Sequence, residues 1–418
     1  MKKTVSLLLL IAILSSLAAT FSSCALFADD GGASSESISE SESTSGSEPT
    51  VEGTTFSVTL TEYTEAFSTL GDKARAYMNA SDSTSIAKIV EAEAGYIPLD
   101  QSEWYQRDTK PFRAYRFDKP MPVSLSFAVE DIENDATFAL AIVFVSENAD
   151  MENAVPYTTD TTAIDIYNLK SDTDYYWRVT AVLSDGSAAT SEIGSFVTAD
   201  TPRLLYIDGL YNVRDIGGWE GLDGERIRQG LVYRGTQLDG LHNEPDFHLT
   251  EEGATALALL GIKTDLDMRG ASNSVSPIEG ATRKNFAPSS YGSAFGSGKY
   301  IYGQMLKEFA DPDNYPMYVH CTYGADRTGT LFYILEALLG VSEEDLLREY
   351  ELTGLVFGSV SREPILRPDL HKVLAGLNAY DGDTLADCAE AYCLDVGLTQ
   401  EEIDTIREIF LTDALTDY

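Results

Sequence analysis

The chain has 418 residues, which suits two or three domains, and its 44% hydrophobic content is that of ordinary globular proteins. Its 67 acidic and 29 basic residues give a formal net charge of −38. Nucleic-acid binding is disfavoured because it needs clustered Lys and Arg, and any anionic ligand must be captured by a local arrangement of donors.

The N-terminus has the features of an export signal. Two lysines precede an apolar stretch over residues 5–17, followed by small residues and Cys24. This stretch is shorter than the ~20 residues that cross a bilayer, so no permanent transmembrane helix is expected. The residues before Cys24 resemble a bacterial lipoprotein cleavage box, although Phe21 is unusual there, and an ordinary cleaved signal is the alternative. We therefore expect a signal over residues 1–24, lipidation of Cys24, and anchoring to the outer face of a bacterial cell membrane.

Two segments with little sign of a specific function follow. Residues 25–54 are rich in Ser, Glu, Gly and Thr and lack the apolar content of a folded domain. We expect them to form a solvated tether, as a surface-displayed protein requires. Residues 55–107 carry no functional motif and stay unassigned, with a helix expected over residues 63–79.

Residues 108–200 have the pattern of a β-sandwich, with short apolar strands separated by turn residues. Residues 169–179 look like the tyrosine-corner region of a fibronectin type III domain, which implies that Tyr175 hydrogen-bonds back to the backbone. Trp177 alternates with apolar neighbours, so burial in the core is favoured over stacking on carbohydrate. We expect a spacer or docking module. The predicted strands are residues 123–129, 138–146, 163–167, 175–183 and 194–198.

Residues 320–329 form the most informative segment of the chain. They place Cys321 and Arg327 six positions apart, enough to wrap one tetrahedral phosphate. A short strand is predicted before them over residues 317–319, and a buried helix after them over residues 331–339. Strand, tight loop and helix N-terminus make an anion site, because free N–H groups and the helix dipole converge there. The residues expected to contact the phosphate are Thr322, Tyr323, Gly324, Ala325 and Thr328.

The residue types in this loop suit nucleophilic displacement at phosphorus. Cys321 as a thiolate would attack the phosphate ester, and water would then hydrolyse the phosphocysteine. The planar fork of Arg327 matches two phosphate oxygens. Thr328 is expected to hydrogen-bond the sulfur and ease its departure, while His320 is expected to orient the loop. Gly324 permits the sharp turn.

The leaving group needs a proton, so a general acid is expected. Asp326 lies inside the loop beside the arginine. Asp267 lies near the end of a strand predicted over residues 262–269, at the edge where sites form in α/β sheets. We favour Asp326, because its sequence position brings it close to the phosphate, and keep Asp267 as the alternative.

These residues resemble the Cys-x5-Arg protein tyrosine phosphatase superfamily, and most closely a bacterial branch whose loop reads H-C-x-x-G-K-D-R-T-G. Residues 212–218 look like the N-x-R-D-hydrophobic-G-G signature of that branch, and residues 267–269 stand where it carries Asp-Leu-Arg. The resemblance spans residues 203–418 and implies an α/β phosphatase domain with a central sheet and surrounding helices. Arg214 and Arg269 would then line or brace the pocket; structural ion pairs with Asp215 and Asp267 are the alternative.

One departure from the branch bears on the substrate. Ala325 replaces a lysine that family members use with phosphoinositides, whose extra phosphates need an extra cation. The absence of this lysine favours phosphotyrosine-like monoesters as substrates, either in a phosphorylated protein or in a small phosphate ester. Phosphoinositides or other small-molecule phosphates are the alternative substrates. A non-catalytic surface-binding protein with a phosphatase fold is the third possibility.

The remaining cysteines, Cys388 and Cys393, fall in a helix predicted over residues 386–395 and should point in different directions. A disulfide between them would require a broken helix. Histidine and cysteine pairs with ligand spacing do not occur in the sequence, so we expect no metal and no other cofactor. An exported thiol enzyme must also keep Cys321 reduced.

Helices are expected to complete the C-terminal domain. Ser342 and Thr399 each begin a capping-box pattern with an acidic residue three positions later. They predict helices over residues 343–352 and 400–411, which should cover the sheet.

Overall fold

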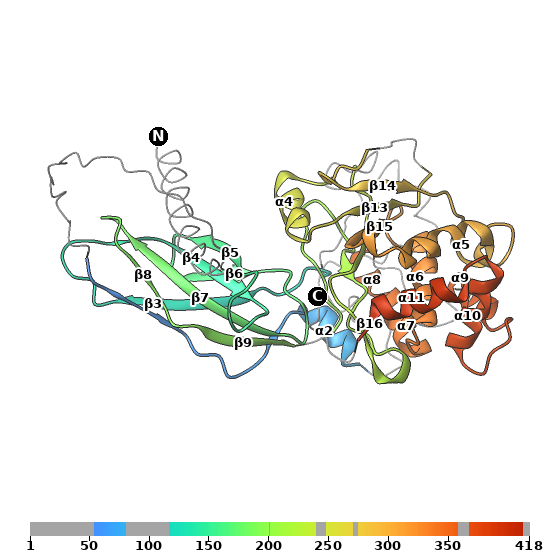
Figure 1. The fold of residues 1–418 in the computed structure, drawn as a ribbon, viewed down its shortest axis with the longest axis horizontal. Helices are drawn as coiled ribbons and strands as arrows, with labels where there is room; N and C mark the ends of the chain where they lie inside the picture. The colour runs from blue at the N-terminus through green and yellow to red at the C-terminus, as the bar shows by residue number, and fades with distance from the viewer. Residues whose placement is uncertain are drawn as a thin grey trace, which may run out of the picture. The chain divides into compact units, whose positions relative to one another are not determined.

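A computed structural model describes residues 54–80, 117–199, 201–239, 248–270, 275–357 and 368–412 (Figure 1). The expected signal, the tether and Cys24 lie outside these ranges and stay predictions. Among the described helices, none combines the length and the apolar character that a membrane crossing requires.

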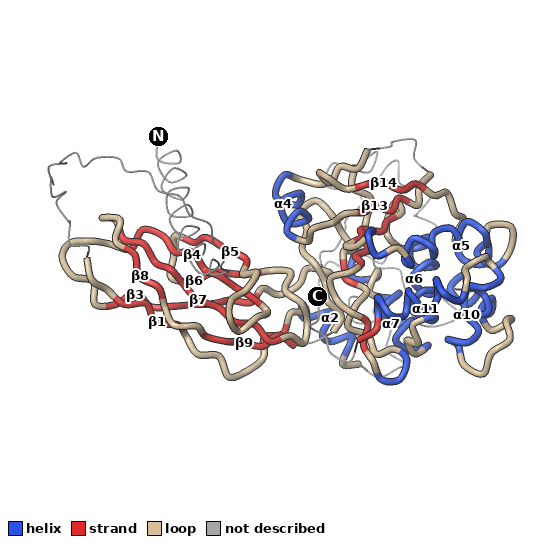
Figure 2. Tube along the Cα trace, in the orientation of Figure 1, coloured by secondary structure: helices blue, strands red, loops and turns tan. Residues whose placement is uncertain are grey.

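The N-terminal part of the described chain consists of two packed β-sheets (Figure 2). Alternating burial along β3 sends Val123, Leu125 and Phe127 into a shared core, where they meet Val143 and Val179 from the other sheet. One sheet has the order β1-β3-β6, with bounds Ser57–Leu60, Val123–Glu130 and Ala163–Ile166. The other sheet has the order β2-β9-β7-β4-β5, and β8 pairs with β7. Its strands are β2 Phe67–Ser68, β9 Gly194–Ala199, β7 Asp174–Leu183, β4 Phe138–Ser146, β5 Val155–Thr159 and β8 Ala188–Thr190.

The predicted tyrosine corner is present in this part. Tyr175 Oη accepts a hydrogen bond of 2.8 Å from Lys170 N, and the Tyr175 ring stacks on Phe196 with centroids 5.4 Å apart. Trp177 is 0% exposed within the core, so the prediction of a core tryptophan is confirmed. The more specific assignment to a fibronectin type III domain stays a prediction.

The boundary predicted for this part at residue 108 is wrong. β1 lies in the segment left unassigned, and it pairs antiparallel with β3 from Ser57↔Glu130 to Leu60↔Phe127. A four-residue strand with mostly half-buried side chains offers too little alternation to be recognised in sequence. The helix expected over residues 63–79 is shorter: α2 spans Asp72–Met78 and follows β2 and Gly71.

The C-terminal part is built on a five-stranded sheet of order β10-β12-β15-β13-β14. β12, β15, β13 and β14 run parallel, and β10 is antiparallel to β12. This mixed sheet with its helices fits the α/β fold predicted for the phosphatase-like domain. The strands are Arg214–Asp215, Val232–Gly235, Met317–His320, Thr264–Asp267 and Thr282–Asn285 in sheet order, and β11 Arg226–Ile227 pairs separately with β16 Leu411–Thr412.

Helix α6 is buried from Thr328 to Leu338, where its side chains are apolar apart from Thr328, Thr330 and Glu336. α6 contacts α7, α9 and α10, as Figure 1 shows. The α-helices are α4 Glu251–Leu259, α5 Lys299–Lys307, α6 Asp326–Leu338, α7 Glu343–Glu351, α8 Gly354–Phe357, α9 Pro368–Leu377, α10 Leu385–Asp395 and α11 Gln400–Phe410. The 3-10 helices are η3 Leu222–Gly224, η4 Tyr291–Phe295, η5 Glu308–Ala310 and η6 Pro312–Asn314.

The predicted helix starts are confirmed. Ser342 Oγ accepts from Asp345 N at 3.1 Å before α7, and Thr399 forms a complete capping box before α11. Each helix ends one residue earlier than predicted. Thr384 forms a further capping box, which the sequence reading missed, and α10 starts at Leu385.

A buried carboxyl group inside α6 gives a pH-dependent prediction. Glu336 is 1% exposed and, among the described residues, its Oε1 has no hydrogen-bond partner. Burial and the nearby Glu349 raise the pKa of Glu336 well above its ordinary value. The folded state therefore retains a proton that the unfolded state loses, so stability falls as pH rises above about 4.5 toward the folded pKa.

We expect Glu336→Gln to gain stability relative to the wild type by up to about 1.4 kcal/mol per pH unit across that window. Urea unfolding between pH 5 and 8 measures the difference. Glu343→Gln, a change on the exposed start of α7, should show no such divergence. A constant difference between Glu336→Gln and the wild type at all pH values would contradict the prediction.

Candidate active site

Cys321 lies at the carboxyl edge of the central sheet, as the sequence predicts. It directly follows β15, the middle strand, and α6 begins at Asp326. The ends of the flanking strands reach the same edge, because His320 pairs with Gly235 of β12 and Asp267 of β13. Cys321 is 3% exposed. The strand, loop and helix N-terminus expected for an anion site are all present.

The loop after β15 is fixed by donors to its backbone carbonyls. Four consecutive carbonyls are bound by groups from around the loop, and each trans peptide points its N–H opposite to its C=O. The N–H groups that follow these carbonyls are thereby turned toward the inside of the loop, where an anion would lie. The donors are His320 Nδ1 to Cys321 O at 3.0 Å, Gln237 N to Thr322 O at 3.2 Å, Asn212 Nδ2 to Tyr323 O at 3.1 Å, and Arg234 Nη2 to Gly324 O at 2.8 Å.

Gly324 meets a conformational demand at the turn of this loop. Its φ is +65°, and an added Cβ would lie 2.3 Å from Gly235 O on β12. A side chain is therefore excluded both by the left-handed backbone and by the neighbouring strand. The sequence expectation for Gly324 is confirmed.

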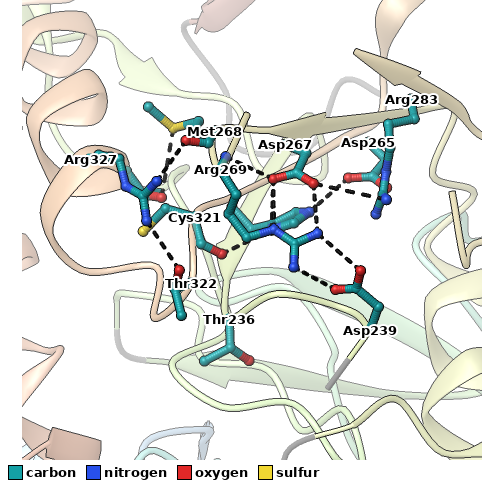
Figure 3. A network of polar contacts seen from close by, with 12 residues as sticks. Thr236, Asp239, Asp265, Asp267, Met268, Arg269, Arg283, Cys321, Thr322 and Arg327 are labelled. Atoms are coloured by element: carbon teal, nitrogen blue, oxygen red, sulfur yellow. Dashed lines mark hydrogen bonds and ion pairs between the residues drawn. The ribbon is translucent and has the colours of Figure 1, made fainter. Parts of the chain in front are cut away.

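Arg327 spans from the loop to the end of β13 (Figure 3). Its Nη1 donates to Met268 O at 3.0 Å, and its Nη2 donates to Thr322 Oγ1 at 3.1 Å. These bonds hold the guanidinium beside Cys321, in the place a phosphate-binding fork requires. Thr322 thus contributes its side chain as well as its backbone.

The role expected for Thr328 is wrong in this structure. Its hydroxyl is buried and lies 3.8 Å from Met268 Sδ, to which it donates, rather than bonding the sulfur of Cys321. The first turn of a helix packed against a strand end leaves the side chain facing β13 and not the loop. Thr328 therefore helps to seat Met268, whose carbonyl holds Arg327.

Asp326 is the first residue of α6 and is half-buried. Tyr291 Oη donates a hydrogen bond to Asp326 Oδ1, and Tyr350 Oη lies 2.8 Å from Tyr291 Oη. Burial, with Tyr350 and Asp326 close by, raises the pKa of Tyr291 far above its usual 10.0, so the phenol keeps its proton and stays a donor. The φ of Tyr291 is +55°, in the left-handed region. Asp326 is thus oriented by a phenol that sequence reasoning missed.

Asp267 does not fit the role of a proton donor. It is 0% exposed and accepts from Arg269 at three points: N at 2.9 Å, Nε at 2.8 Å and Nη2 at 2.7 Å. Burial acts to raise the pKa of Asp267, but the hydrogen bonds from Arg269 and the charge of His320 lower the pKa below 3.8. An acid must hold its proton at working pH, so these contacts favour Asp326 over Asp267, and the assignment of the acid stays a prediction.

Arg269 and Arg214 brace the site and do not line it. Arg269 uses the rest of its fork on Asp239, with Nη1 and Nη2 at 2.6 and 3.2 Å from its two oxygens (Figure 3). Arg214 is buried, with its Nε 2.6 Å from Glu349 Oε1. The substrate-binding role expected for both is therefore corrected.

The alternative of structural ion pairs is confirmed for Arg269 with Asp267 but not for Arg214 with Asp215. Asp215 pairs instead with Arg203 at 3.0 Å. Arg214 turns to Glu349 because Asp215 is the next residue along β10 and therefore faces the other side of the sheet.

A second buried group anchors the base of the loop. His320 Nδ1 must donate, because its partner is the carbonyl of Cys321, while its Nε2 lies 3.0 Å from Asp265 Oδ1. Arg283 Nε donates to the other oxygen of Asp265 at 2.8 Å. Burial acts to raise the pKa of Asp265, yet the hydrogen bond and charge of His320 lower it, so the carboxylate stays ionised. The expectation that His320 orients the loop is confirmed.

The other described cysteines differ from Cys321 in their surroundings. Cys388 and Cys393 are both buried and free within α10. Burial raises the pKa of the Cys393 thiol to about 12, which keeps it protonated. Within the described ranges, no group of three or more His, Cys, Asp or Glu side chains could hold a metal ion.

Comparisons with known proteins agree with this geometry. Residues 205–412 match the family model described as the tyrosine phosphatase family. A Cupriavidus necator protein provisionally named a tyrosine-protein phosphatase is 30% identical over 176 residues, covering 35% of this chain and 61% of the relative. A tyrosine-protein phosphatase of Nostoc commune is 25% identical over 209 residues, covering 38% of this chain and 69% of the relative. The match thus spans less than two thirds of the first relative, and the matches together support the family and phosphatase activity in general.

Proposed function

We propose that this chain, whose C-terminal half is matched to the tyrosine phosphatase family, hydrolyses phosphate monoesters through a covalent intermediate on Cys321. The observation that carries the proposal is the loop of outward-held carbonyls around Cys321, with Arg327 fixed beside it. Inward N–H groups, a helix N-terminus and a guanidinium fork together stabilise the charge that builds on phosphate oxygens in the transition state.

The reaction would proceed in two displacements. The Cys321 thiolate forms a bond to phosphorus as the bond to the leaving oxygen breaks, and that oxygen takes the proton of Asp326. Water then attacks the phosphocysteine, Asp326 takes the water proton, and the S–P bond breaks to return the thiolate and release inorganic phosphate. Arg327 holds two phosphate oxygens through both steps.

A phosphotyrosine-like ester is the substrate class that the charges favour. Ala325 brings no cation, and Arg214, Arg234 and Arg269 are committed to the carboxylates of the protein. These three arginines are therefore not free to bind the further phosphates of a substrate that carries several. Phosphoinositides or other small phosphates are the second candidate, and a non-catalytic binding role is the third.

Hydrolysis assays on the full chain in reducing buffer test the proposal. We expect turnover of p-nitrophenyl phosphate and of a phosphotyrosine peptide, with lower kcat/KM on inositol phosphates. Absence of turnover on every monoester would contradict phosphatase chemistry. A clear preference for inositol lipids would contradict the proposed substrate class. We expect Ala325→Lys to raise the activity on inositol lipids, and no gain would mean that the missing lysine does not set the substrate class.

Substitution of the two aspartates assigns the general acid. Asp326→Asn should slow esters of poor leaving groups, such as phenyl phosphate, by roughly 10²–10⁴-fold and esters of good leaving groups much less. The reason is that a good leaving group departs without a proton. Asp267→Asn is the matched control, and its losses should be the same for all leaving groups, because it disturbs position only. Equal losses for all esters with Asp326→Asn would reject Asp326 as the acid.

We also propose export and membrane attachment through lipidated Cys24, with residues 25–54 as a tether and a fibronectin type III-like spacer or docking module before the phosphatase domain. The motif at Cys24 and the composition of the following residues support this address. Expressed in a bacterium, the chain should partition with membranes, and Cys24→Ala should release it. Equal membrane partitioning of Cys24→Ala and the wild type would contradict the anchor.

A further inference from the structure

The N-terminal sandwich contains an insertion whose described ends contact the phosphatase domain. β1 and β3 are neighbours in one sheet, yet residues 61–122 lie between them in sequence. The described part of this segment, residues 61–80 and 117–122, is here called the insertion. The two ends of the insertion run together. Met121 N donates to Thr69 O at 3.0 Å, and a Cβ at Gly71 would lie 2.8 Å from Lys119 O, which requires a glycine there.

Helix α2 of the insertion belongs to the core of the phosphatase domain. Leu70, Ala74 and Tyr77 are buried in the same apolar cluster as the residues of α6 and α7. Tyr77 Oη donates to Glu351 Oε2 at 2.5 Å, and Arg348 Nη1 donates to Met78 O at 3.3 Å. The core therefore includes side chains that lie well outside the matched residues 205–412.

The second end of the insertion leads directly to the Cys321 loop. Asp118 is 2% exposed, and its Oδ2 accepts from Asn212 N at 2.9 Å. Asn212 has a left-handed φ of +56°, and its side-chain Nδ2 donates to Tyr323 O at 3.1 Å. The carboxylate of Asp118 thus fixes the residue that holds one of the loop carbonyls.

A parallel chain of contacts runs through α7, the helix on which α2 packs. Asn212 Oδ1 accepts from Arg214 Nη1 at 2.5 Å, and Arg214 binds Glu349. Glu349 Oε2 accepts from Arg234 Nη1 at 2.7 Å, and Arg234 Nη2 donates to Gly324 O. One loop carbonyl, Tyr323 O, therefore depends on a residue that the insertion contacts directly, and the next, Gly324 O, is joined to that residue only through Arg234, Glu349 and Arg214.

We propose that the insertion positions the Cys321 loop, with Asp118 as the positioning residue that orients Asn212. The inference extends the proposed function, because it names an element outside the phosphatase-like domain on which the same site depends. The Asp118 carboxylate accepts from Asn212 N and keeps the backbone of Asn212 in place. Without this acceptor, Asn212 Nδ2 would no longer hold Tyr323 O, and the peptide between Tyr323 and Gly324 could turn. The N–H of Gly324 would then move away from the position of the phosphate. The effect should fall on the transition state more than on substrate binding.

Three full-chain variants test this in parallel. Asp118→Ala removes the acceptor, Asp118→Asn keeps an acceptor oxygen of the same reach, and Asp72→Ala changes an exposed residue of the same insertion. Each is assayed for kcat and KM on p-nitrophenyl phosphate. Each is also assayed for the rate of alkylation of Cys321 by iodoacetamide from pH 5 to 9, read by mass spectrometry of its peptide. Thermal unfolding sets an assay temperature at which all are folded.

We expect Asp118→Ala to lower kcat by about tenfold, the effect of one lost charge-assisted hydrogen bond, with KM within about twofold. In Asp118→Ala, the curve of the Cys321 alkylation rate against pH should also be displaced along the pH axis. Asp118→Asn and Asp72→Ala should keep kcat and this curve near those of the wild type. Unchanged kcat and alkylation in folded Asp118→Ala would overturn the proposal, as would equal losses in the Ala and Asn variants. Should the wild type lack turnover, the proposed function fails, whereas an altered profile in Asp118→Ala alone still supports the positioning role.

Discussion

Replacing Cys321 by serine should reduce hydrolysis of p-nitrophenyl phosphate at least about 10⁴-fold, because a serine hydroxyl stays protonated where a thiolate forms and attacks phosphorus. The loop that stabilises the charge is unaffected by exchange of sulfur for oxygen, so the substrate should still bind. Steady-state kinetics with a binding measurement on phosphotyrosine peptide would show loss of kcat with retained affinity.

Cys388→Ser is the matched control for this change. Cys388 is also buried and free, and its Sγ donates to Tyr380 O at 3.3 Å, a bond that a hydroxyl retains. This variant should keep full activity. Turnover in Cys321→Ser within tenfold of the wild type would mean that a different nucleophile, such as water, attacks the ester.

Arg327→Lys should reduce kcat/KM by roughly 10³-fold although the positive charge is kept. A lysine cannot present two parallel donors to phosphate, and it also loses the bonds that join Arg327 to Met268 O and Thr322 Oγ1. The loop therefore loses a phosphate ligand and a tie to β13 in one substitution. Kinetics on p-nitrophenyl phosphate measure the loss.

An exposed arginine provides the comparison for this result. Arg75→Lys on α2 changes a side chain that is 45% exposed and should leave kcat/KM at the wild-type value. A loss of less than tenfold in Arg327→Lys would show that point charge alone suffices, and the fork geometry would then have no part in transition-state binding.

The parts of the fold that the sequence could predict are those set by local patterns of apolar residues, turn residues and helix caps. β4 matches its predicted bounds because it is a continuous apolar run with turn residues on both sides, and α7 and α11 begin at the predicted caps. The Cys321 loop was equally predictable, because Cys321 and Arg327 lie in one short segment between an apolar strand and an apolar helix.

The supports of the loop were not predictable, because they depend on contacts between distant segments. Glu349 sits on a helix whose charged residues normally face solvent, and only the packing of α7 shows that it binds Arg214 and Arg234 in the interior. Asp267 misled for the same reason: its place at a strand end suggested chemistry, while Arg269, two residues later, holds it as a carboxylate. Charge type in sequence does not reveal the partner.

The packing of α2 on α7 also has a consequence for the order of events during synthesis. Tyr77 precedes its partner Glu351 by 274 residues. At a synthesis rate of about 5–20 residues per second, the apolar face of α2 would wait roughly 14–55 seconds for the surface that covers it. The sandwich and the phosphatase domain would then mature together, and a nascent chain would carry an uncovered helix through most of its production.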